Sequence, residues 1–403
     1  MLECGLLGEK LGHSYSPAIH NMLGGYSYRL FERKPAEVEV FLRNGQWNGL
    51  NVTIPYKKTV FPYMDSVSDA AQAVGSINTI VKKPDGAMFG DNTDVYGFRE
   101  MLRHSGIRVS GAKVLVLGSG GASAAVTYVL RSEGAIPVII SRSGENNYDN
   151  LALHADAEVI VNTTPLGMYP NNGASAVDLT CFPKCRGVLD VVYNPARTAL
   201  LLQAEKLGIA AENGLYMLVA QAARSSERFT GIPVPGEKTE AIYRTLSGSL
   251  QNLILIGMPG CGKSTVARKL GELTGRRVLD SDEEITKHYH ATPEELIRTK
   301  GEAAFRDMEH EVLTELGKES GAIIATGGGA VTRKDNYPEL HQNGIILWLR
   351  RDVEQLATDH RPLSQQTSPA KLYAMRRPMY EAFADRSYEV EEQTAERILE
   401  ELQ

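Results

Sequence analysis

The sequence predicts an α/β protein built from parallel sheets with helices on their faces. Short β-rich runs alternate with helix-length amphipathic segments along most of the 403 residues, the pattern of parallel sheets covered by helices. Two of these runs lead directly into glycine-rich turns, at Gly118 and at Gly257. Two such turns on one chain suggest two nucleotide sites, and hence two fused enzymes.

Composition narrows the class of protein. Hydrophobic residues make up 42% and charged residues 23%, which excludes a disordered chain or a disulfide scaffold. The net charge of -6 argues against a nucleic-acid-coating protein. No apolar run approaches the roughly 18 residues needed to cross a bilayer, and no secretory signal stands at the N-terminus. We therefore expect a cytoplasmic protein without membrane or nucleic-acid partners, and the possibility of a homo-oligomer stays open.

The four cysteines form no disulfide framework, in keeping with a reducing compartment. Cys181 and Cys185 could be half of a zinc site, but no second Cys/His pair accompanies them, so we predict no zinc there.

The predicted strands fall into two sets. The first comprises Lys113–Leu117, Pro137–Ile140, Glu158–Asn162 and Gly187–Val192. The second comprises Leu253–Ile256, Arg277–Leu279, Ala322–Ala325 and Ile345–Leu349. Small residues at Ser247-Gly248-Ser249 suggest a flexible junction just before the second set, which divides the chain into residues 1–248 and 249–403.

The first glycine-rich turn has features of a dinucleotide site. Glycines let the backbone approach a pyrophosphate at the N-terminus of the next helix, although a purely structural turn is the alternative. After the following strand stand Ser141 and Arg142, where an NAD enzyme usually carries an acidic residue; an arginine there suits the extra phosphate of NADP. The segment from Arg142 to Asn162 is short, so we expect the intervening helix to be short or missing.

Polar groups are dense in the first hundred residues. Lys57 can supply both a proton and positive charge to a ketone that accepts hydride, and Asp94 can hold Lys57 and a substrate hydroxyl in place. A purely structural ion pair is the alternative for these two residues. Each of the other polar motifs in these hundred residues could simply form a turn or a helix cap. Together, however, they provide the hydroxyl, amide and charged groups that can bind a polyhydroxy acid.

Residues 1 to about 248 resemble shikimate dehydrogenase. The motifs that carry the resemblance are His13–Pro17, Asn51–Lys57, Asn78-Thr79, Asp91–Asp94, Gly118–Ala122, Asn162–Met168, Asp190–Pro195, and Asn213–Leu218 with Gln221. The resemblance implies a two-lobed fold, with a substrate lobe of about 1–95 plus 215–248 and a Rossmann-type NADP lobe of about 96–214. It implies that shikimate is surrounded by Ser14, Ser16, Thr53, Asn78, Asp94, Tyr193 and Gln221. Along NADP it implies Asp69, Gly118, Ser119, Gly120, Gly121, Ala122, Ser141, Arg142 and Gly214.

The second glycine-rich turn reads G-x-x-x-x-G-K-S from Gly257 to Ser264, between a predicted strand and a predicted helix. That context is typical of a phosphate-binding P-loop, in which Lys263 neutralises phosphate and Ser264 can ligate Mg²⁺. Cys261 is most simply a small loop residue. Two carboxylates, Asp280 and Asp282, follow the next predicted strand. One of them could be directed at Mg²⁺, and the other could accept the proton of a substrate hydroxyl.

Residues from about 250 to 403 resemble shikimate kinase. The resemblance implies that Asp282, Arg306, Gly328 and Arg376 contact shikimate, with Asp282 accepting the hydroxyl proton. Asp280 and Ser264 would position Mg²⁺. It implies that ATP is held by Gly260, Cys261, Gly262, Lys263, Ser264, Thr265 and the lid residue Arg361. The lid sequence around Arg361 is short and lacks a second basic residue, so we expect weaker ATP binding, slower turnover, or a substitute from elsewhere in the chain.

Together the two resemblances imply a bifunctional enzyme that reduces 3-dehydroshikimate to shikimate with NADPH and then phosphorylates shikimate to shikimate 3-phosphate with ATP and Mg²⁺. One alternative is an NAD-preferring quinate/shikimate dehydrogenase fused to a kinase, against which Arg142 argues. The other is a regulatory protein derived from these domains. Such a protein would be expected to lose chemical groups, whereas this chain keeps Lys57, Asp94, Lys263, Ser264 and Asp282.

Overall fold

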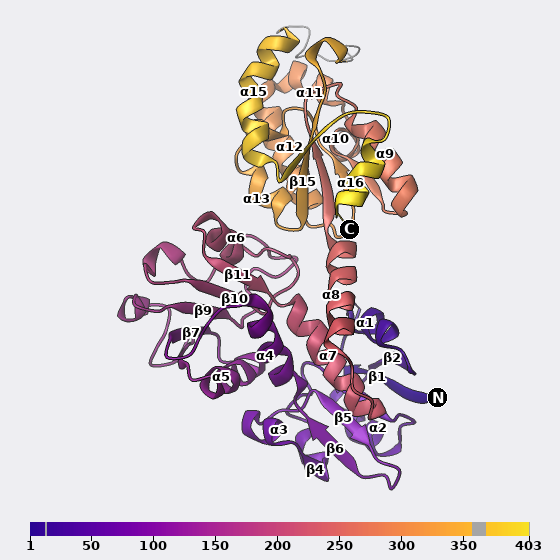
Figure 1. The fold of residues 1–403 in the computed structure, drawn as a ribbon, viewed down its shortest axis with the longest axis vertical. Helices are drawn as coiled ribbons and strands as arrows, with labels where there is room; N and C mark the ends of the chain where they lie inside the picture. The colour runs from indigo at the N-terminus through magenta and orange to yellow at the C-terminus, as the bar shows by residue number, and fades with distance from the viewer. Residues whose placement is uncertain (13, 357–367, 403) are drawn as a thin grey trace. The chain divides into compact units, whose positions relative to one another are not determined.

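The computed structural model describes residues 1–12, 14–356 and 368–402. The chain forms two compact units, each with its own sheets and cores (Figure 1). Unit 1 comprises Met1–Met168, Ala174–Tyr193 and Leu200–Thr245. Unit 2 comprises Tyr169–Gly173, Asn194–Ala199 and Leu246–Gln403.

The first sheet of unit 1 has six strands in the order β2-β1-β3-β5-β6-β4. Their bounds are β1 Leu2–Gly8, β2 Tyr26–Glu32, β3 Gly49–Val52, β4 Ser66–Val67, β5 Thr79–Lys82 and β6 Met88–Asp91. Strands β1, β2 and β3 are parallel, whereas β5 runs antiparallel to both β3 and β6. The carboxyl ends of β3 and β6 and the amino end of β5 therefore meet at one edge. The helices of this part of the chain are α1 Ser16–Leu23, α2 Val38–Asn44, α3 Asp69–Val74 and α4 Thr93–Ser105.

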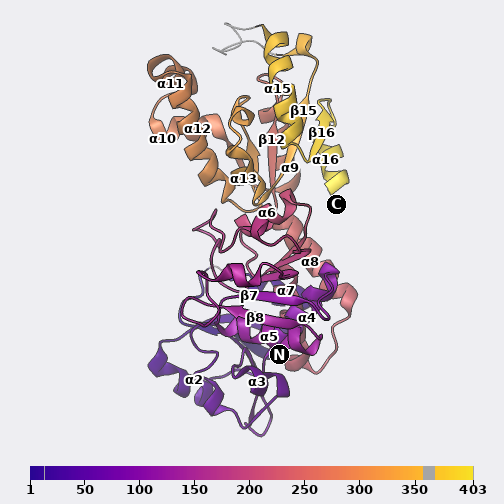
Figure 2. The same ribbon diagram turned by 90° about the vertical axis from the view of Figure 1, so that its left-hand side faces the viewer.

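The second sheet of unit 1 is entirely parallel, in the order β11-β10-β9-β7-β8, as the fold class predicted. Its strands are β7 Lys113–Leu117, β8 Ile136–Ile140, β9 Val159–Asn162, β10 Gly187–Asp190 and β11 Ala210–Asn213. Helix α5 (Gly121–Ser132) connects β7 to β8, and both views show α4 and α5 beside this sheet (Figure 2). Only a 3-10 turn, Leu151–His154, lies between β8 and β9, which confirms the missing helix. The remaining helices associated with this part of the chain are α6 Ala199–Lys206, α7 Leu215–Thr230 and α8 Gly236–Leu250.

The sheet of unit 2 is also parallel, in the order β13-β14-β12-β15-β16. Its strands are β12 Asn252–Ile256, β13 Val278–Asp280, β14 Ile323–Ala325, β15 Gly344–Arg350 and β16 Arg386–Glu389. Its helices are α9 Lys263–Thr274, α10 Ser281–Tyr289, α11 Pro293–Lys300, α12 Glu302–Gly317, α13 Asn336–His341, α15 Pro369–Phe383 and α16 Thr394–Leu402. The central strand β12 is buried along its whole length, as its continuous apolar run predicts for a strand covered on both faces.

The prediction of a flexible junction at Ser247-Gly248-Ser249 is wrong, because these residues lie inside helix α8. The Ser249 hydroxyl bonds to the Leu246 carbonyl, and the Gln251 amide bonds to the Ser247 carbonyl. Serine and glycine are only moderately unfavourable in a helix, so local hydrogen bonding keeps the segment helical. The two compact units divide between Thr245 and Leu246, within this helix.

Among the described residues, no helix combines the length and the apolar character that a membrane span requires.

The packing of α12 against α13 depends on the absence of a side chain at Gly317, because a Cβ there would collide with the Glu339 carbonyl. Neither backbone segment can give way cheaply, so we expect Gly317→Ala to lower the unfolding free energy of unit 2 by about 2 kcal/mol. Each unit contains one of the two tryptophans, so urea unfolding of a Trp47→Phe background, followed by Trp348 fluorescence, measures the effect. Gly248→Ala is the control: nothing lies within 4 Å of its Cβ position, and the change should raise stability by about 0.5 kcal/mol. An equal response of the two variants would contradict the packing argument.

Candidate active sites

Three predicted residues meet at the strand edge of the first sheet. The Lys57 ammonium donates to Asp94 Oδ2 at 2.6 Å, and the Asn78 amide donates to Asp94 Oδ1 at 2.8 Å. Lys57 follows β3, Asn78 precedes β5, and Asp94 lies in the first turn of α4 just after β6. The helix N-terminus favours the negative charge of Asp94. Both carboxylate oxygens are therefore engaged, and the ammonium is held at one position.

A buried hydroxyl network, which sequence reasoning did not identify, supports this group. Thr93 donates its backbone N–H to Asn78 Oδ1 at 2.7 Å, and its hydroxyl lies 3.0 Å from that of Ser225 in α7. The Ser225 hydroxyl also lies 2.9 Å from that of Thr79, and Thr93 Oγ1 lies 3.4 Å from Gln221 Oε1. Buried polar groups satisfied in this way fix the side chains they contact. Thr79 and Thr93 belong to the motifs Asn78-Thr79 and Asp91–Asp94 identified in the sequence. Ser225 could not be identified as a functional residue from the sequence, because serines are common in helices.

The other predicted substrate residues have separate local contacts. The Ser16 backbone N–H donates to Ser14 Oγ at 3.2 Å. Tyr193 packs against Tyr15 with ring centroids 5.8 Å apart, and burial raises the pKa of its phenol. Across the described ranges, Ser14, Ser16, Thr53 and Tyr193 make no hydrogen bond to Lys57 or Asp94. Their roles stay predictions.

The turn between β7 and α5 has the backbone that a dinucleotide needs. Gly118 has φ 106°, and a Cβ there would lie 2.9 Å from Thr163 Oγ1, so glycine is required by the fold itself. Gly120 and Gly121 are different: both are exposed, neither has a positive φ, and no atom lies within 4 Å of their Cβ positions. No side chain caps α5, which begins here. The open space before an uncapped helix N-terminus fits a pyrophosphate.

The other residues predicted to contact the dinucleotide lie at or near the ends of strands and helices, and their positions alone do not show a contact with a cofactor. Arg142 is exposed immediately after β8, and Ser141 is half-buried beside it. Asp69 is the first residue of α3, after the capping Ser68. At Gly214 a Cβ would collide with the Val191 carbonyl, so internal packing alone accounts for this glycine. Contacts of these residues with a cofactor stay predictions.

The predicted P-loop lies between β12 and α9 and has an unusual backbone. Gly260 and Gly262 have φ values of 84° and 106°, which favour glycine. Lys263 is only 8% exposed, and its ammonium donates to the carbonyls of Gly257 at 2.9 Å and Met258 at 3.0 Å. A ligand phosphate would replace these carbonyls as the partner of the ammonium. Cys261 is fully buried, in agreement with its interpretation as a small loop residue.

Hard oxygen ligands lie beside the P-loop. The Ser264 hydroxyl donates to Asp280 Oδ2 at 2.8 Å, while Asp280 Oδ1 caps α10 by accepting the Asp282 backbone N–H at 3.0 Å. A hydroxyl and a carboxylate this close fit Mg²⁺, which takes few protein ligands when phosphates supply others. In the part of the chain that the structure describes, no cluster of three or more His, Cys, Asp or Glu side chains could hold a metal by itself.

Asp282 lies among other acidic groups. Its side chain reaches solvent, but loss of surrounding water, together with the negative charges of Asp280 and Glu309, raises its carboxyl pKa to about 6. Lys263 and Arg306 oppose this shift. Asp282 can therefore exchange a proton near neutral pH.

Two arginines converge on the glycine-rich turn after β14. Arg306 Nη1 donates to Glu309 Oε2 at 2.7 Å, and a Cβ on Gly329 would collide with the Arg306 guanidinium. Arg376 Nη1 donates to the Gly328 carbonyl at 3.0 Å, and among the described residues the buried Nε atoms of both arginines have no hydrogen-bond partner. These two guanidinium groups are therefore placed to receive an anionic ligand.

Glu309 and Tyr380 support this arrangement and were not predicted. Glu309 is 1% exposed, and burial raises its pKa while Arg306 opposes the shift. The Tyr380 hydroxyl donates to the Gly328 carbonyl at 2.6 Å. Both residues lie on amphipathic helices, where a glutamate or a tyrosine gives no signal of a functional position. The predicted lid residue Arg361 lies outside the described residues.

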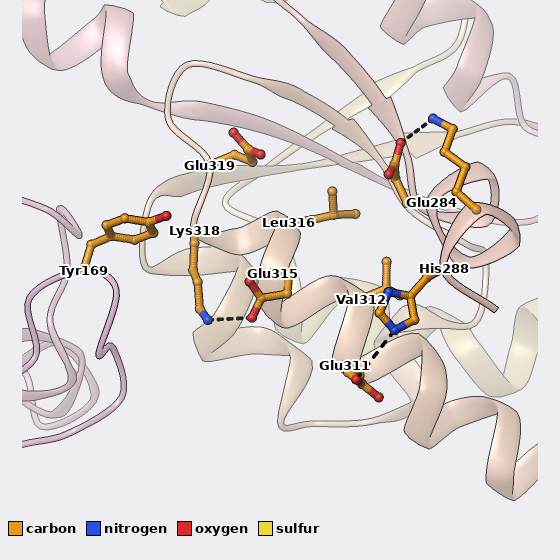
Figure 3. A pocket seen from close by; sticks show the side chains of 10 residues that line it. Tyr169, Glu284, His288, Glu311, Val312, Glu315, Leu316, Lys318 and Glu319 are labelled. Atoms are coloured by element: carbon orange, nitrogen blue, oxygen red, sulfur yellow. Dashed lines mark hydrogen bonds and ion pairs between the residues drawn. The ribbon is translucent and has the colours of Figure 1, made fainter. Parts of the chain in front are cut away.

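A separate pocket in unit 2 contains none of the predicted site residues (Figure 3). Its charged groups pair with one another: Lys287 with Glu284 and Lys318 with Glu315, each at 2.6 Å. His288 lies 3.8 Å from Glu311. Because its lining includes neither the P-loop nor any other predicted site residue, we do not treat this pocket as a candidate active site.

Comparisons with known proteins agree with both halves of the chain. A family model for the shikimate dehydrogenase substrate binding domain matches residues 6–80, and a model for shikimate kinase matches residues 259–403. A shikimate dehydrogenase (NADP(+)) of Clostridium perfringens is 38% identical over 264 residues, covering 60% of this chain and 97% of the relative.

Solved structures match the same region. A chorismate mutase/shikimate 5-dehydrogenase fusion protein from Clostridium acetobutylicum is 36% identical with a TM-score of 0.58, covering 61% of this chain and 97% of its own. Shikimate 5-dehydrogenase from Thermus thermophilus, in complex with NADP(H) and shikimate, is 30% identical with a TM-score of 0.56, covering 61% and 99%. Quinate dehydrogenase from Corynebacterium glutamicum, in complex with NAD, is 29% identical with a TM-score of 0.55, covering 61% and 99%.

The raised pKa of Asp282 has a consequence for stability. Because the folded state holds this proton more tightly than the unfolded chain does, stability falls as pH rises from about 4 to about 6. We expect Asp282→Asn to be more stable than the parent at pH 7 and to lose that advantage below about pH 4. Urea midpoints from Trp348 fluorescence at both pH values measure this. Glu283→Gln, a change at the exposed neighbour on α10, should show no such gain, and a destabilised Asp282→Asn at pH 7 would contradict the argument.

Proposed function

Because the chain belongs to the shikimate dehydrogenase family and carries a shikimate kinase domain at residues 259–403, we propose that it catalyses two consecutive reactions. Unit 1 would reduce 3-dehydroshikimate to shikimate with NADPH, and unit 2 would transfer the γ-phosphoryl group of ATP to the 3-hydroxyl. The observation that carries the proposal is the retention of both sets of reactive groups. Lys57 is held by Asp94, and Lys263 lies in the P-loop of the unit that contains Asp282.

In the reduction, the bound dinucleotide supplies hydride to the carbonyl carbon of the substrate. Lys57 would donate its proton to the carbonyl oxygen as that oxygen gains negative charge, and so complete the alcohol. Asp94 orients the ammonium, and Asn78 prevents the carboxylate from turning away. The amine of Lys57 would then take a proton from water.

In the phosphorylation, Asp282 would accept the proton of the 3-hydroxyl while that oxygen bonds to the γ-phosphorus and ADP leaves. Lys263 would compensate the charge of the phosphates, and Mg²⁺ when bound would add to this beside Ser264 and Asp280. Arg306 and Arg376 would bind the substrate carboxylate, since a guanidinium matches its two oxygens. These roles would fix the hydroxyl near Asp282.

A coupled assay starting from 3-dehydroshikimate, NADPH and ATP–Mg²⁺ tests both reactions. We expect shikimate 3-phosphate from the parent chain and none from Lys57→Ala, whose reduction kcat should fall by about 10²- to 10⁴-fold while KM changes little. Added shikimate should restore phosphorylation by Lys57→Ala. Lys263→Ala should instead stop the sequence at shikimate. Lys58→Ala, a change at the exposed neighbouring lysine, is the matched control and should behave as the parent.

The alternatives give different outcomes in the same assay. Strong preference for NADH and quinate in initial rates would favour the quinate/shikimate dehydrogenase, a candidate because a quinate dehydrogenase bound to NAD is among the structural matches. Arg142 is the sequence feature that favours NADPH. Absence of both NADPH oxidation and ATP consumption in the parent chain would favour a regulatory protein.

The kinase reaction should depend on the protonation of Asp282. A carboxyl whose pKa is about 6 is protonated below that pH and cannot accept the hydroxyl proton. We expect kcat/KM for shikimate to rise with pH and level off above about 6 to 7, and Asp282→Asn to lose at least about 10²-fold in kcat. A Lys57→Ala background with added shikimate isolates this reaction. A parent profile that stays flat from pH 5 to pH 8 would contradict the role of Asp282.

A further inference from the structure

One arginine beside the P-loop has no assigned role. Arg351 directly follows β15, which pairs in parallel with β12 so that Trp348 lies opposite Ile256. Both strands therefore end at the same edge, and the P-loop leaves β12 next to the end of β15. The approach is close, because a Cβ on Gly257 would collide with the Leu349 carbonyl.

The side chain of Arg351 extends along the P-loop to its far end. Arg351 Nη1 lies 4.0 Å from the position that a Cβ on Gly262 would occupy, and Val390 Cγ1 lies 3.4 Å from the same point. Gly262 immediately precedes Lys263, where α9 begins. The guanidinium thus lies beside the backbone that would bind phosphate.

The charge of Arg351 is not compensated by the protein groups that the structure describes. Its Nε is buried without a partner, and no hydrogen bond or ion pair joins its guanidinium to another described residue. The Nε of the adjacent Arg350 is also buried without a described partner, but Arg350 differs because its Nη2 lies 3.0 Å from Glu389 Oε1 and its guanidinium 5.6 Å from the Trp348 ring centroid. A partly buried cation without a counter-charge is unfavourable, so an anionic ligand is the natural partner of Arg351.

We propose that Arg351 binds the phosphates of the nucleotide held in the P-loop. The proposal rests on the proposed kinase function. It identifies the substitute for the second basic residue that the short lid sequence lacks. A guanidinium fixed to the end of β15 would supply that charge without depending on the lid.

Direct binding measurements on the full chain test this proposal. We expect the Kd of ATP–Mg²⁺, measured by calorimetry, to rise about tenfold or more in Arg351→Gln, since a charge-assisted hydrogen bond to phosphate is lost. Arg351→Lys should lie between Arg351→Gln and the parent. Arg350→Gln, the matched control on the same strand end, should stay within about twofold of the parent. Unchanged dehydrogenase rates and an unchanged urea midpoint of Trp348 fluorescence would show that the variants fold.

Inorganic tripolyphosphate, tested as a competitor of ATP, identifies the part of the nucleotide concerned. A phosphate contact predicts that its inhibition constant rises in Arg351→Gln by the same factor as the Kd of ATP. Weaker ATP binding with unchanged tripolyphosphate inhibition would overturn the proposal in favour of a contact with the base. Equal effects of Arg351→Gln and Arg350→Gln would also overturn it. Failure of the parent chain to bind ATP or phosphorylate shikimate would instead refute the proposed function.

Discussion

The meeting of strand ends at one edge of a sheet is the constraint on which both candidate sites depend, and in the sheet of unit 2 parallel pairing provides it. Parallel pairing brings the carboxyl ends of neighbouring strands to one edge of a sheet, where loops leave the core and polar groups can be exposed without interrupting the ladders. The first sheet reaches the same result with an antiparallel strand, because β5 begins where β3 and β6 end. Lys57, Asn78 and Asp94 meet for this reason although they lie in three separate segments. The P-loop and Arg351 share the corresponding edge of the last sheet.

Both sites hold charged groups in place with protein partners that a ligand would replace or supplement. Lys263 is bonded to two carbonyls of its own loop, and Arg306 is bonded to a buried glutamate. For Asp282 the surroundings act in the opposite way, because burial and the neighbouring carboxylates raise its pKa and make its charged form costly. Such arrangements keep reactive groups oriented before substrate arrives, at some expense to the stability of the unit.

Sequence reasoning located the central strands of the two parallel sheets well, but not the strands of the first sheet or the supporting residues. The eight predicted strands match the observed ones to within about two residues, because continuous apolar runs before glycine turns are distinctive. The six strands of the first sheet, β11 and β16 were not predicted; in β2 and β16 the charged residues Arg29 and Arg386 make the alternation of apolar and polar residues imperfect. Glu309 and Ser225 gave no signal because their roles arise only when distant segments pack together. The missing helix between β8 and β9 was predictable, because the segment from Arg142 to Asn162 is too short to hold a full helix as well as its connecting loops.

The turn at Gly327–Gly329 has a consequence for how this chain can vary. Each glycine faces a different neighbour: a Cβ would meet Glu309 and Asp282 at the first position, Pro259 of the P-loop at the second, and Arg306 at the third. Any single-base change that replaces a glycine codon with that of another amino acid adds at least a Cβ atom. Every point mutation of this tripeptide that alters the protein therefore displaces a candidate functional group or the phosphate loop. The cost of such a change differs among the three codons, because the carboxylates and the guanidinium are ends of flexible side chains that can move, whereas Pro259 belongs to the P-loop backbone. We therefore expect the codon of Gly328 to vary least over evolutionary time.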